Sequence, residues 1–192
     1  MRLLVIVDMQ NDFITGSLKN EAAGLIVPGI CGLIGKLDDE DRIVTTQDTH
    51  EISYLSTREG KKLPIEHCIR GTAGWCVADQ IVKTVKKRDE RLNCVSGELE
   101  KDSFGCKDLI GYIDEYPTFF DEIVVVGTCT DICVITNALL LKTHFPETRI
   151  VVLSDLCAGS SKANHEAALK VMQSCQIDVV DSKTYLKEVS AK

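Results

Sequence analysis

The chain has 192 residues, of which 44% are hydrophobic and 27% charged, a balance typical of a soluble globular protein. Its net charge is −7 and its longest basic stretch covers residues 86–88, so nucleic acid is not expected as a partner. Asp8 interrupts the apolar N-terminus, and no apolar window has the roughly 18 residues of a membrane span. We therefore expect a cytoplasmic protein, independent of membranes, with a single domain over residues 1–192.

Apolar, mostly β-branched segments alternate along the chain with amphipathic ones. The apolar segments predict strands at 3–9, 42–48, 92–98, 122–128, 149–155 and 177–182. The amphipathic segments predict helices at 28–39, 77–88, 107–116, 130–145 and 164–176. Pro28 suits a first helical position, and Thr130 suits an N-cap. The strands are almost continuously apolar, as is typical of strands covered on both faces.

This alternation predicts βαβ units and therefore an α/β fold. We expect three α/β/α layers around a central six-stranded, mainly parallel sheet. In such sheets a ligand binds beyond the carboxyl ends of the strands. Asp8, Asp48 and Cys129 each lie at or just after such an end, so they are expected to meet. The segment 49–76 is long, polar and irregular, and a loop of that length is usually functional.

The nine cysteines are expected to be reduced thiols, and most of them to be small buried residues. No pair has the C-x-x-C spacing of a zinc ribbon or a thioredoxin-type redox centre. Cys133 differs, because it falls in the first turn of the helix predicted from Thr130. Free backbone N–H groups and the positive end of the helix dipole would stabilise a thiolate there. That position suits either a nucleophile or a cysteine packed on the sheet.

Two charged residues near predicted strand ends are further candidates for chemistry. Asp8 would be costly to bury without a partner, and it could take a proton from a thiol and later deliver it to a leaving group. Its alternative role is a hydrogen bond to the loop that begins near Asn11. Lys101 follows the third predicted strand and could pair with Asp8. Its alternative is a solvated lysine on the surface.

The polar loop after the second predicted strand carries a candidate metal site. Asp48 and His50 form a D-x-H pair, whose members face the same side of an extended chain. Glu59 and His67 follow in the same loop. Two imidazoles with one or two carboxylates suit a borderline divalent ion such as Zn²⁺, Fe²⁺ or Mn²⁺. The alternative is a polar surface loop that binds nothing.

Five motifs follow one another along the chain: VDMQNDF at 7–13, TQDTH at 46–50, HCIRGTAGW at 67–75, EKDSFGC at 100–106 and VVGTCTDICV at 125–134. In this order, and with a lysine between the first and the last, they resemble the isochorismatase-like cysteine hydrolases. Within that family they are most similar to the nicotinamidases. The resemblance covers nearly the whole chain and implies the Rossmann-like isochorismatase fold. Family members commonly assemble, so we expect a homo-oligomer.

The resemblance also implies roles for single residues. It implies a catalytic triad of Asp8, Lys101 and Cys133, with Cys133 as the nucleophile. It implies a cis peptide bond between Thr128 and Cys129, and an oxyanion hole made by the backbone N–H groups of Cys129 and Cys133. Phe13, the last residue of VDMQNDF, would line the pocket as an aromatic wall.

For the metal, the family pattern matches Asp48, His50 and His67. The fourth ligand in the family is a further histidine or a glutamate, and no histidine lies between positions 50 and 67. We therefore assign Glu59, with Glu51 and Ser56 as the alternatives. One divalent ion is implied, Zn²⁺ first, with Mn²⁺ or Fe²⁺ as alternatives. LPIEH at 63–67 departs from the pattern, because nicotinamidases often carry an aromatic residue shortly before this histidine.

The sequence thus predicts an amidohydrolase that converts nicotinamide to nicotinate and ammonia through a thioester. The nearest alternative is a family amidase that acts on another small amide or ureido compound. A metal-free ether hydrolase and a non-catalytic binding protein with the same fold are the remaining alternatives.

Overall fold

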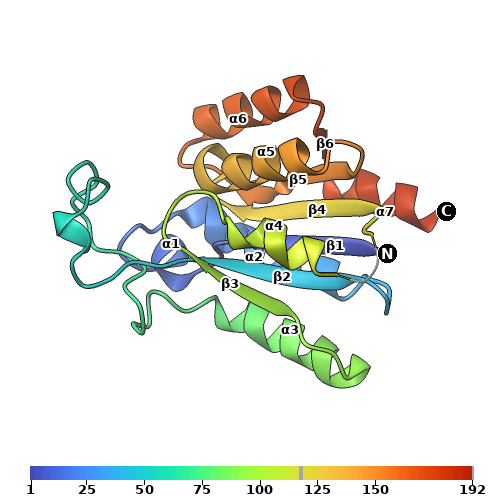
Figure 1. Ribbon diagram of the computed structural model, residues 1–192, viewed down its shortest axis with the longest axis horizontal. Helices are drawn as coiled ribbons and strands as arrows, with labels where there is room; N and C mark the ends of the chain where they lie inside the picture. Colours follow the sequence, from blue (N-terminus) through green and yellow to red (C-terminus); the bar gives the residue numbers. More distant parts are fainter. Residues whose placement is uncertain (117–118, 192) are drawn as a thin grey trace.

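The structure is a computed structural model that describes residues 1–116 and 119–191. Within these residues, six parallel strands form one sheet in the order β3-β2-β1-β4-β5-β6 (Figure 1). The strands are β1 Arg2–Val7, β2 Arg42–Asp48, β3 Gly97–Lys101, β4 Glu122–Thr128, β5 Arg149–Ala158 and β6 Asp178–Val180. The predicted parallel α/β sheet is confirmed.

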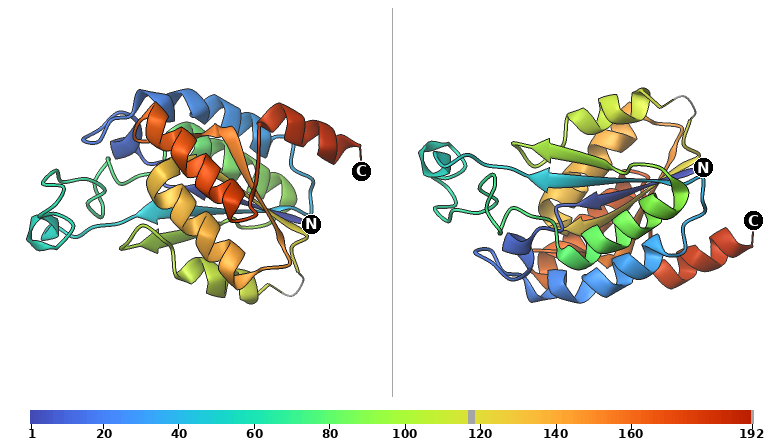
Figure 2. Two further views of the ribbon diagram at one scale, coloured as in Figure 1. Left: turned by 90° about the horizontal axis from the view of Figure 1, so that it is seen from above. Right: turned by 90° about the horizontal axis from the view of Figure 1, so that it is seen from below.

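Helices cover both faces of the sheet and complete the three predicted layers. One face packs against α2 Glu21–Ile34, α3 Asp79–Leu92 and α7 Ser182–Ser190. The opposite face packs against α4 Asp108–Asp114, α5 Ile135–His144 and α6 Lys162–Ser174. The two views of Figure 2 show these layers from either side. The remaining elements are the short helix α1 Asn11–Ile14, the 3-10 turn η1 Tyr54–Ser56 and the π-helical turn η2 Thr130–Val134.

The central strand β1 explains why the strands are so continuously apolar. Successive side chains point to opposite faces of a sheet, and both faces are covered by helices here. Leu4 and Ile6 belong to the core on one face. Leu3, Val5 and Val7 belong to the core on the other. All five are at most 1% exposed, so none of these five positions has room for a polar side chain.

The third predicted strand, 92–98, is wrong in its bounds. Helix α3 continues to Leu92 and is ended by Asn93, whose φ of 50° places it in the left-handed region. Asp89 then accepts a hydrogen bond from the backbone N–H of Ser96 at 2.8 Å, which shapes the turn before β3. The strand itself runs from Gly97 to Lys101. Lys101 is therefore the last residue of β3 and does not lie beyond it.

Two helix starts also differ from prediction, and one helix was not predicted. Helix α2 begins at Glu21, where the Asn20 side chain accepts a hydrogen bond from the backbone N–H of Ala22 at 3.0 Å. Pro28, predicted at a first helical position, lies inside this helix. Thr130, predicted as an N-cap, is the first residue of the π-helical turn. No helix was predicted over the residues of α7.

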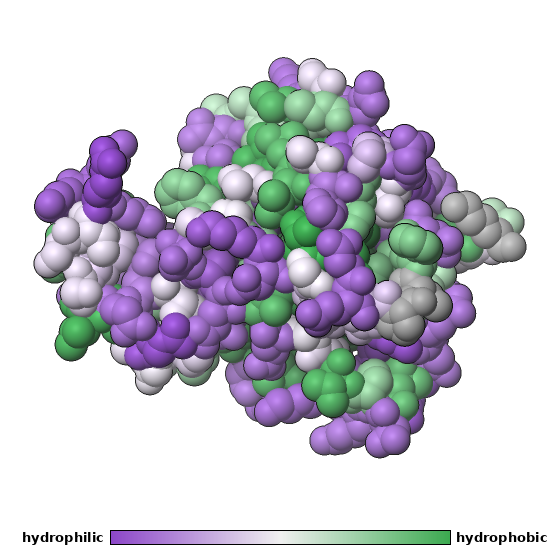
Figure 3. Space-filling view, viewed as in Figure 1, coloured by the Kyte–Doolittle hydropathy of each residue, from purple (hydrophilic) through white to green (hydrophobic). Residues whose placement is uncertain are grey.

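The surface is mainly hydrophilic on the face seen in Figure 3. The loop after β2 projects beyond the carboxyl ends of the strands, at the left of Figure 1. No helix within the described residues is long and apolar enough to cross a membrane. All nine cysteines lie in that part of the chain and are free thiols.

The unpredicted helix α7 is attached to the sheet through a buried carboxylate. The Tyr185 hydroxyl donates to Glu122 Oε1 at 2.5 Å, and Arg149 Nη1 lies 2.5 Å from Glu122 Oε2. Tyr185 is 1% exposed and Glu122 is 6% exposed. A hydrogen bond to a buried charge contributes more than one between neutral groups.

We predict that Tyr185→Phe lowers the free energy of unfolding by roughly 1.5–3 kcal/mol, because Glu122 loses a buried donor. Tyr112→Phe is the matched control, since its hydroxyl bonds neutral groups, the hydroxyl of Tyr116 at 3.1 Å and the backbone of Gly97. That control should lose only about 1 kcal/mol. Denaturant unfolding measures both variants, and equal losses would contradict a special role for Glu122.

Candidate active site

Four neighbouring strands end at the same edge of the sheet, and each brings a polar or thiol group there. Asp8 follows β1, Asp48 ends β2 and Lys101 ends β3, while Cys129 follows β4. The parallel register aligns these ends, because Asp48 pairs with Lys101 and Val7 pairs with both Thr46 and Gly127. The expected meeting of strand ends is therefore present.

Asp8 is completely buried and has a φ of 49°, a left-handed conformation that few residues other than glycine adopt. Its Oδ1 accepts a hydrogen bond from the Thr46 hydroxyl at 2.7 Å. Its Oδ2 lies 2.7 Å from Lys101 Nζ. A buried carboxylate is tolerated when a cation and hydrogen-bond donors surround it. Thr46 of β2 and Lys101 of β3 thus hold the two carboxylate oxygens of Asp8.

The ammonium group of Lys101 is the centre of the site. Besides Asp8, it lies 3.2 Å from Asp48 Oδ1 and 3.5 Å from Cys133 Sγ. Its side chain is 1% exposed. The expectation of a pair between Lys101 and Asp8 is met, and the alternative of a solvated surface lysine is wrong.

The pKa values of these groups follow from burial and from their mutual charges. Burial opposes the charge of Lys101, but Asp8, Cys133 and Asp48 together raise its pKa. Burial raises the pKa of Asp8, and Lys101 offsets only part of that effect. Burial also raises the pKa of the Cys133 thiol, and the charge of Asp8 raises it further. Both effects favour the protonated forms of the Cys133 thiol and the Asp8 carboxyl group.

Cys133 lies in the π-helical turn that directly follows β4, and it is buried. The expected cis peptide bond between Thr128 and Cys129 is present. Two contacts to other elements hold the turn. The Thr130 hydroxyl lies 2.8 Å from Nδ1 of His165 in α6, and Asp131 accepts a hydrogen bond from the backbone N–H of Ser160 at 2.7 Å. Asp131 thus anchors the loop after β5 to this turn.

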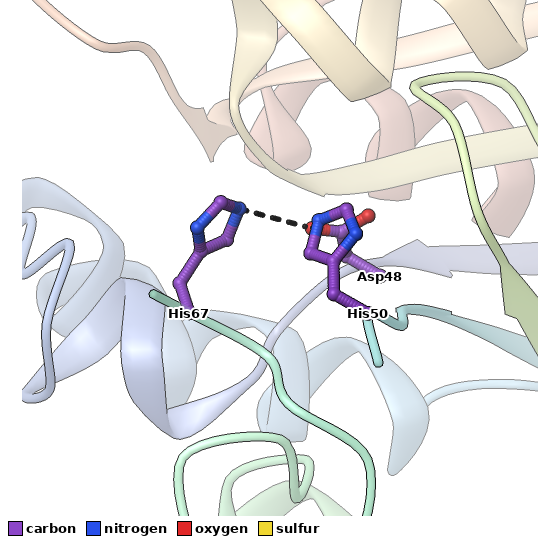
Figure 4. Close-up of side chains that lie close together, drawn as sticks. All are labelled: Asp48, His50 and His67. Carbon is purple, nitrogen blue, oxygen red and sulfur yellow. Dashed lines mark ion pairs between the residues drawn. The ribbon is translucent and has the colours of Figure 1, made fainter. Parts of the chain in front are cut away.

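The candidate metal ligands Asp48, His50 and His67 converge as predicted, with their ligand atoms within 4.8 Å of one another. Asp48 Oδ2 lies 3.1 Å from His50 Nε2 and 3.4 Å from His67 Nε2. Figure 4 shows both imidazole rings turned toward the carboxylate. All three residues are buried.

The nitrogen atoms of this group fit a divalent cation. His67 Nδ1 lies 2.8 Å from the carbonyl oxygen of Ile65, which orients the ring so that Nε2 faces Asp48. His50 Nε2 is buried and, within the described residues, has no hydrogen bond of acceptable geometry despite its closeness to Asp48. A buried polar atom without a partner is rare in native proteins, and a bound cation would provide that partner. Two imidazole nitrogens and a carboxylate are a suitable ligand set for zinc-like ions.

Of the three proposed fourth ligands, Glu59 is the one that faces this group. Its Oε1 lies 3.9 Å from His50 Nε2. Glu51 is exposed and pairs with Arg70 Nε at 3.0 Å. Ser56 is exposed on the 3-10 turn η1. Glu59 therefore approaches His50, but its carboxylate lies outside the group of ligand atoms that lie within 4.8 Å of one another.

A cavity of about 370 Å³ joins the thiol and the metal group. Cys129 and Cys133 line one part of it, and Asp48, Glu59 and His67 line another. Apolar walls come from Phe13, Leu63, Phe104 and Ile132. The Phe13 ring lies 5.9 Å from the His67 ring, consistent with the expected aromatic wall. A larger hollow of about 560 Å³ runs along α3 and β3 but contains none of the predicted site residues.

Two supporting residues escaped the sequence analysis. Gln10 is buried, and its amide accepts from the Asp48 N–H and donates to the Asp48 carbonyl, each at 2.8 Å. Tyr54 is buried against both imidazoles, with ring centroids 4.5 Å from His50 and 4.9 Å from His67. Gln10 lies inside VDMQNDF, but nothing in that motif indicates its partner. Tyr54 lies in a loop whose sequence has no periodicity.

Comparisons with known proteins agree with this geometry. The family model described as an isochorismatase domain matches residues 2–184. A nicotinamidase/pyrazinamidase of Mycobacterium tuberculosis is 29% identical and covers 95% of this chain and 100% of its own length. A nicotinamidase of Schizosaccharomyces pombe is 27% identical, covering 94% of this chain and 93% of its own. The crystal structure of a Bacillus subtilis nicotinamidase/pyrazinamidase superposes with a TM-score of 0.80 at 25% identity, covering 94% of this chain and 99% of that one.

We predict that Gly60→Ala destabilises the loop that carries the candidate metal ligands. A Cβ atom at Gly60 would lie 2.2 Å from the Tyr54 carbonyl oxygen, so backbone has to shift. We expect a loss of roughly 1–3 kcal/mol in unfolding free energy, as for other overpacked sites, together with weaker Zn²⁺ binding. Gly32→Ala, with nothing within 4 Å of its added Cβ, is the control. Unchanged Zn²⁺ affinity in Gly60→Ala, measured by competition with a chelator, would contradict the prediction.

Proposed function

The chain belongs to the isochorismatase domain family, and from that premise we propose that it is a metal-dependent amidase that converts nicotinamide to nicotinate and ammonia. One observation carries the proposal: the Cys133 thiol and the candidate metal ligands Asp48 and His67 line one cavity. Lys101 Nζ connects the two groups, because it contacts Asp8, Cys133 and Asp48. The relatives named nicotinamidase in S. pombe and M. tuberculosis support this choice of substrate.

The substrate ring would lie between the metal group and the apolar walls. Asp48, His50, His67 and Glu59 would hold one divalent ion, with Zn²⁺ as the first choice. Such an ion supplies a Lewis-acidic position that binds the ring nitrogen of nicotinamide. Phe13 contacts one side of the cavity and presents an aromatic face to the ring. These groups bind and orient the substrate, while the carboxamide points to Cys133.

Acylation uses the triad proposed from the sequence. Asp8, whose pKa is raised by burial, accepts the proton of the Cys133 thiol. The thiolate sulfur then forms a bond to the carbonyl carbon, and the carbonyl electrons move to its oxygen. Backbone N–H groups of Cys129 and Cys133 stabilise that oxyanion. Lys101 stays positively charged beside Asp8 and Cys133, and this charge stabilises the buried Cys133 thiolate.

The same proton then serves the leaving group. As the tetrahedral intermediate collapses, the C–N bond breaks and Asp8 transfers its proton to the departing nitrogen, which leaves as ammonia. A thioester to Cys133 remains. Asp8, again a carboxylate, accepts a proton from a water molecule whose oxygen attacks the thioester. As this second tetrahedral intermediate collapses, the C–S bond breaks and Asp8 returns its proton to the sulfur, which restores the thiol. The acid product leaves and loses a proton to solvent as nicotinate, so that one water is consumed and one ammonia is formed per turnover.

A second candidate substrate class is favoured by one feature of the cavity. Leu63 contributes an aliphatic wall where nicotinamidases often carry an aromatic residue nearby. An aliphatic side chain lacks the stacking interaction that an aromatic side chain would make with the ring of the substrate. Another small amide or a ureido compound could therefore be the preferred substrate of the same chemistry. Comparing kcat/KM for nicotinamide, pyrazinamide and aliphatic amides on one preparation separates the two candidates.

We predict that purified protein releases ammonia from nicotinamide in the presence of Zn²⁺, Mn²⁺ or Fe²⁺. Cys133→Ala should reduce kcat by a factor of about 10³ or more, since loss of the nucleophile removes the covalent route. Its metal content should stay near normal, because Cys133 is outside the ligand group. Cys175→Ala is the matched control, an exposed cysteine that should leave turnover unchanged.

Two outcomes would contradict this prediction differently. Ammonia release that persists in Cys133→Ala would remove the proposed nucleophile. No release from nicotinamide under any metal condition, with release from another amide, would replace the substrate and leave the chemistry intact.

We also predict that His50→Ala loses metal and raises KM or eliminates activity, because substrate binding depends on the metal. The loss of metal affinity should exceed the roughly 10–100-fold effect that removal of an outer-sphere partner has. His144→Ala is the control, since that histidine is exposed and lies 3.1 Å from Asp114 on the surface. Metal analysis and steady-state kinetics check both variants. Full activity of metal-free protein would contradict the substrate-holding role.

A further inference from the structure

Asn137 is a fully buried polar residue in α5, four positions after Cys133. Asparagine is a weak helix former, because its side chain competes for nearby backbone groups. Local propensity therefore does not explain its place inside a helix. A buried amide also has to satisfy several hydrogen-bonding groups at once, and the structure shows which ones they are.

The Asn137 amide joins two segments that are distant in sequence. Its Oδ1 accepts a hydrogen bond from the backbone N–H of Cys106 at 2.8 Å. Its Nδ2 donates to the Cys133 carbonyl at 2.8 Å and to the Phe104 carbonyl at 3.3 Å. The partners determine the orientation of the amide, since one is a donor and two are acceptors. A flipped amide would leave all three contacts unfavourable.

The two joined segments carry opposite sides of the site. One is the π-helical turn with Cys133. The other is the loop that connects β3 to α4, which starts directly after Lys101 and includes Phe104. Phe104 is 49% exposed yet lines the cavity, so few core contacts of its own fix it. Asn137 thus ties the thiol both to the loop that follows the lysine and to an apolar wall.

We propose that Asn137 is a positioning residue that sets the π-helical turn against the β3–α4 loop. It keeps Cys133 Sγ within reach of Lys101 Nζ, now 3.5 Å apart, and it keeps Phe104 at the cavity. The proposal rests on the proposed role of Cys133 and is independent of which amide is the substrate. Because the amide bridges three buried or partly buried backbone groups, its loss frees both segments together.

Asn137→Ala tests the proposal. We expect the rate of alkylation of Cys133 by iodoacetamide, followed by mass spectrometry of the Cys133 peptide, to fall about tenfold or more, because the thiolate loses its fixed lysine. With an amide that the enzyme hydrolyses, kcat should fall by a similar factor and KM should rise severalfold as Phe104 loosens.

Thr143→Ala is the matched control, because Thr143 in the same helix bonds the carbonyl four residues before it at 2.7 Å but is exposed and remote from the site. It should alter neither alkylation nor KM. If Asn137→Ala does not fold, Asn137→Ser serves instead: its hydroxyl reaches the Cys133 carbonyl but not the loop at 104–106. Wild-type alkylation and KM in a folded Asn137 variant would overturn the proposal. Alkylation needs no substrate, so this result is separate from any failure of the proposed reaction.

Discussion

The site depends on one buried ammonium group. Lys101 Nζ lies between the carboxylates of Asp8 and Asp48 and beside the Cys133 thiol, with its side chain 1% exposed. Any of these charges alone would be expensive to bury, and removal of one partner from a buried pair destabilises by several kcal/mol. Together they are tolerated because the strands β3, β2 and β1 end in register at one edge of the sheet. The apolar strands thus create the low-dielectric place in which the charges act strongly on one another.

Asp48 links this charge cluster to the metal group. One of its oxygens faces Lys101, and the other faces the nitrogens of His50 and His67. Gln10 fixes the backbone of Asp48 at both its N–H and its carbonyl. The proposed nucleophile and the proposed metal are therefore not independent sites. A change of charge at the nucleophile or at the metal alters the electrostatic environment of the other through the Asp48 carboxylate.

The sequence predicted most of the charged residues of the site, but it did not predict the buried residues that hold them in place. Apolar runs locate strands that are covered on both faces, and an acid at the end of such a run is conspicuous. Asp8 and Asp48 could be recognised in this way, whereas Lys101 ends the mostly polar strand β3 and its pairing with Asp8 was only one of two alternatives until the family resemblance favoured it. Gln10 and Asn137 could not, because their partners are backbone groups that only the folded chain brings near. The bounds of β3 failed for a similar reason, since the left-handed turn at Asn93 is stabilised by contacts to Asp89 and not by an obvious glycine.

The chemistry and the selectivity of the site are built on different parts of the fold. The charged groups sit at strand ends, where the sheet holds them, whereas Leu63 and Phe104 reach the cavity from loops. Loops tolerate substitution, and function on one fold diversifies through them. A change at Leu63 can therefore alter which amide fits without moving the thiol, the acid or the lysine. In the proposed enzyme, the reaction class would thus depend on the groups at the strand ends, whereas the choice of substrate would depend on two apolar side chains and the proposed metal.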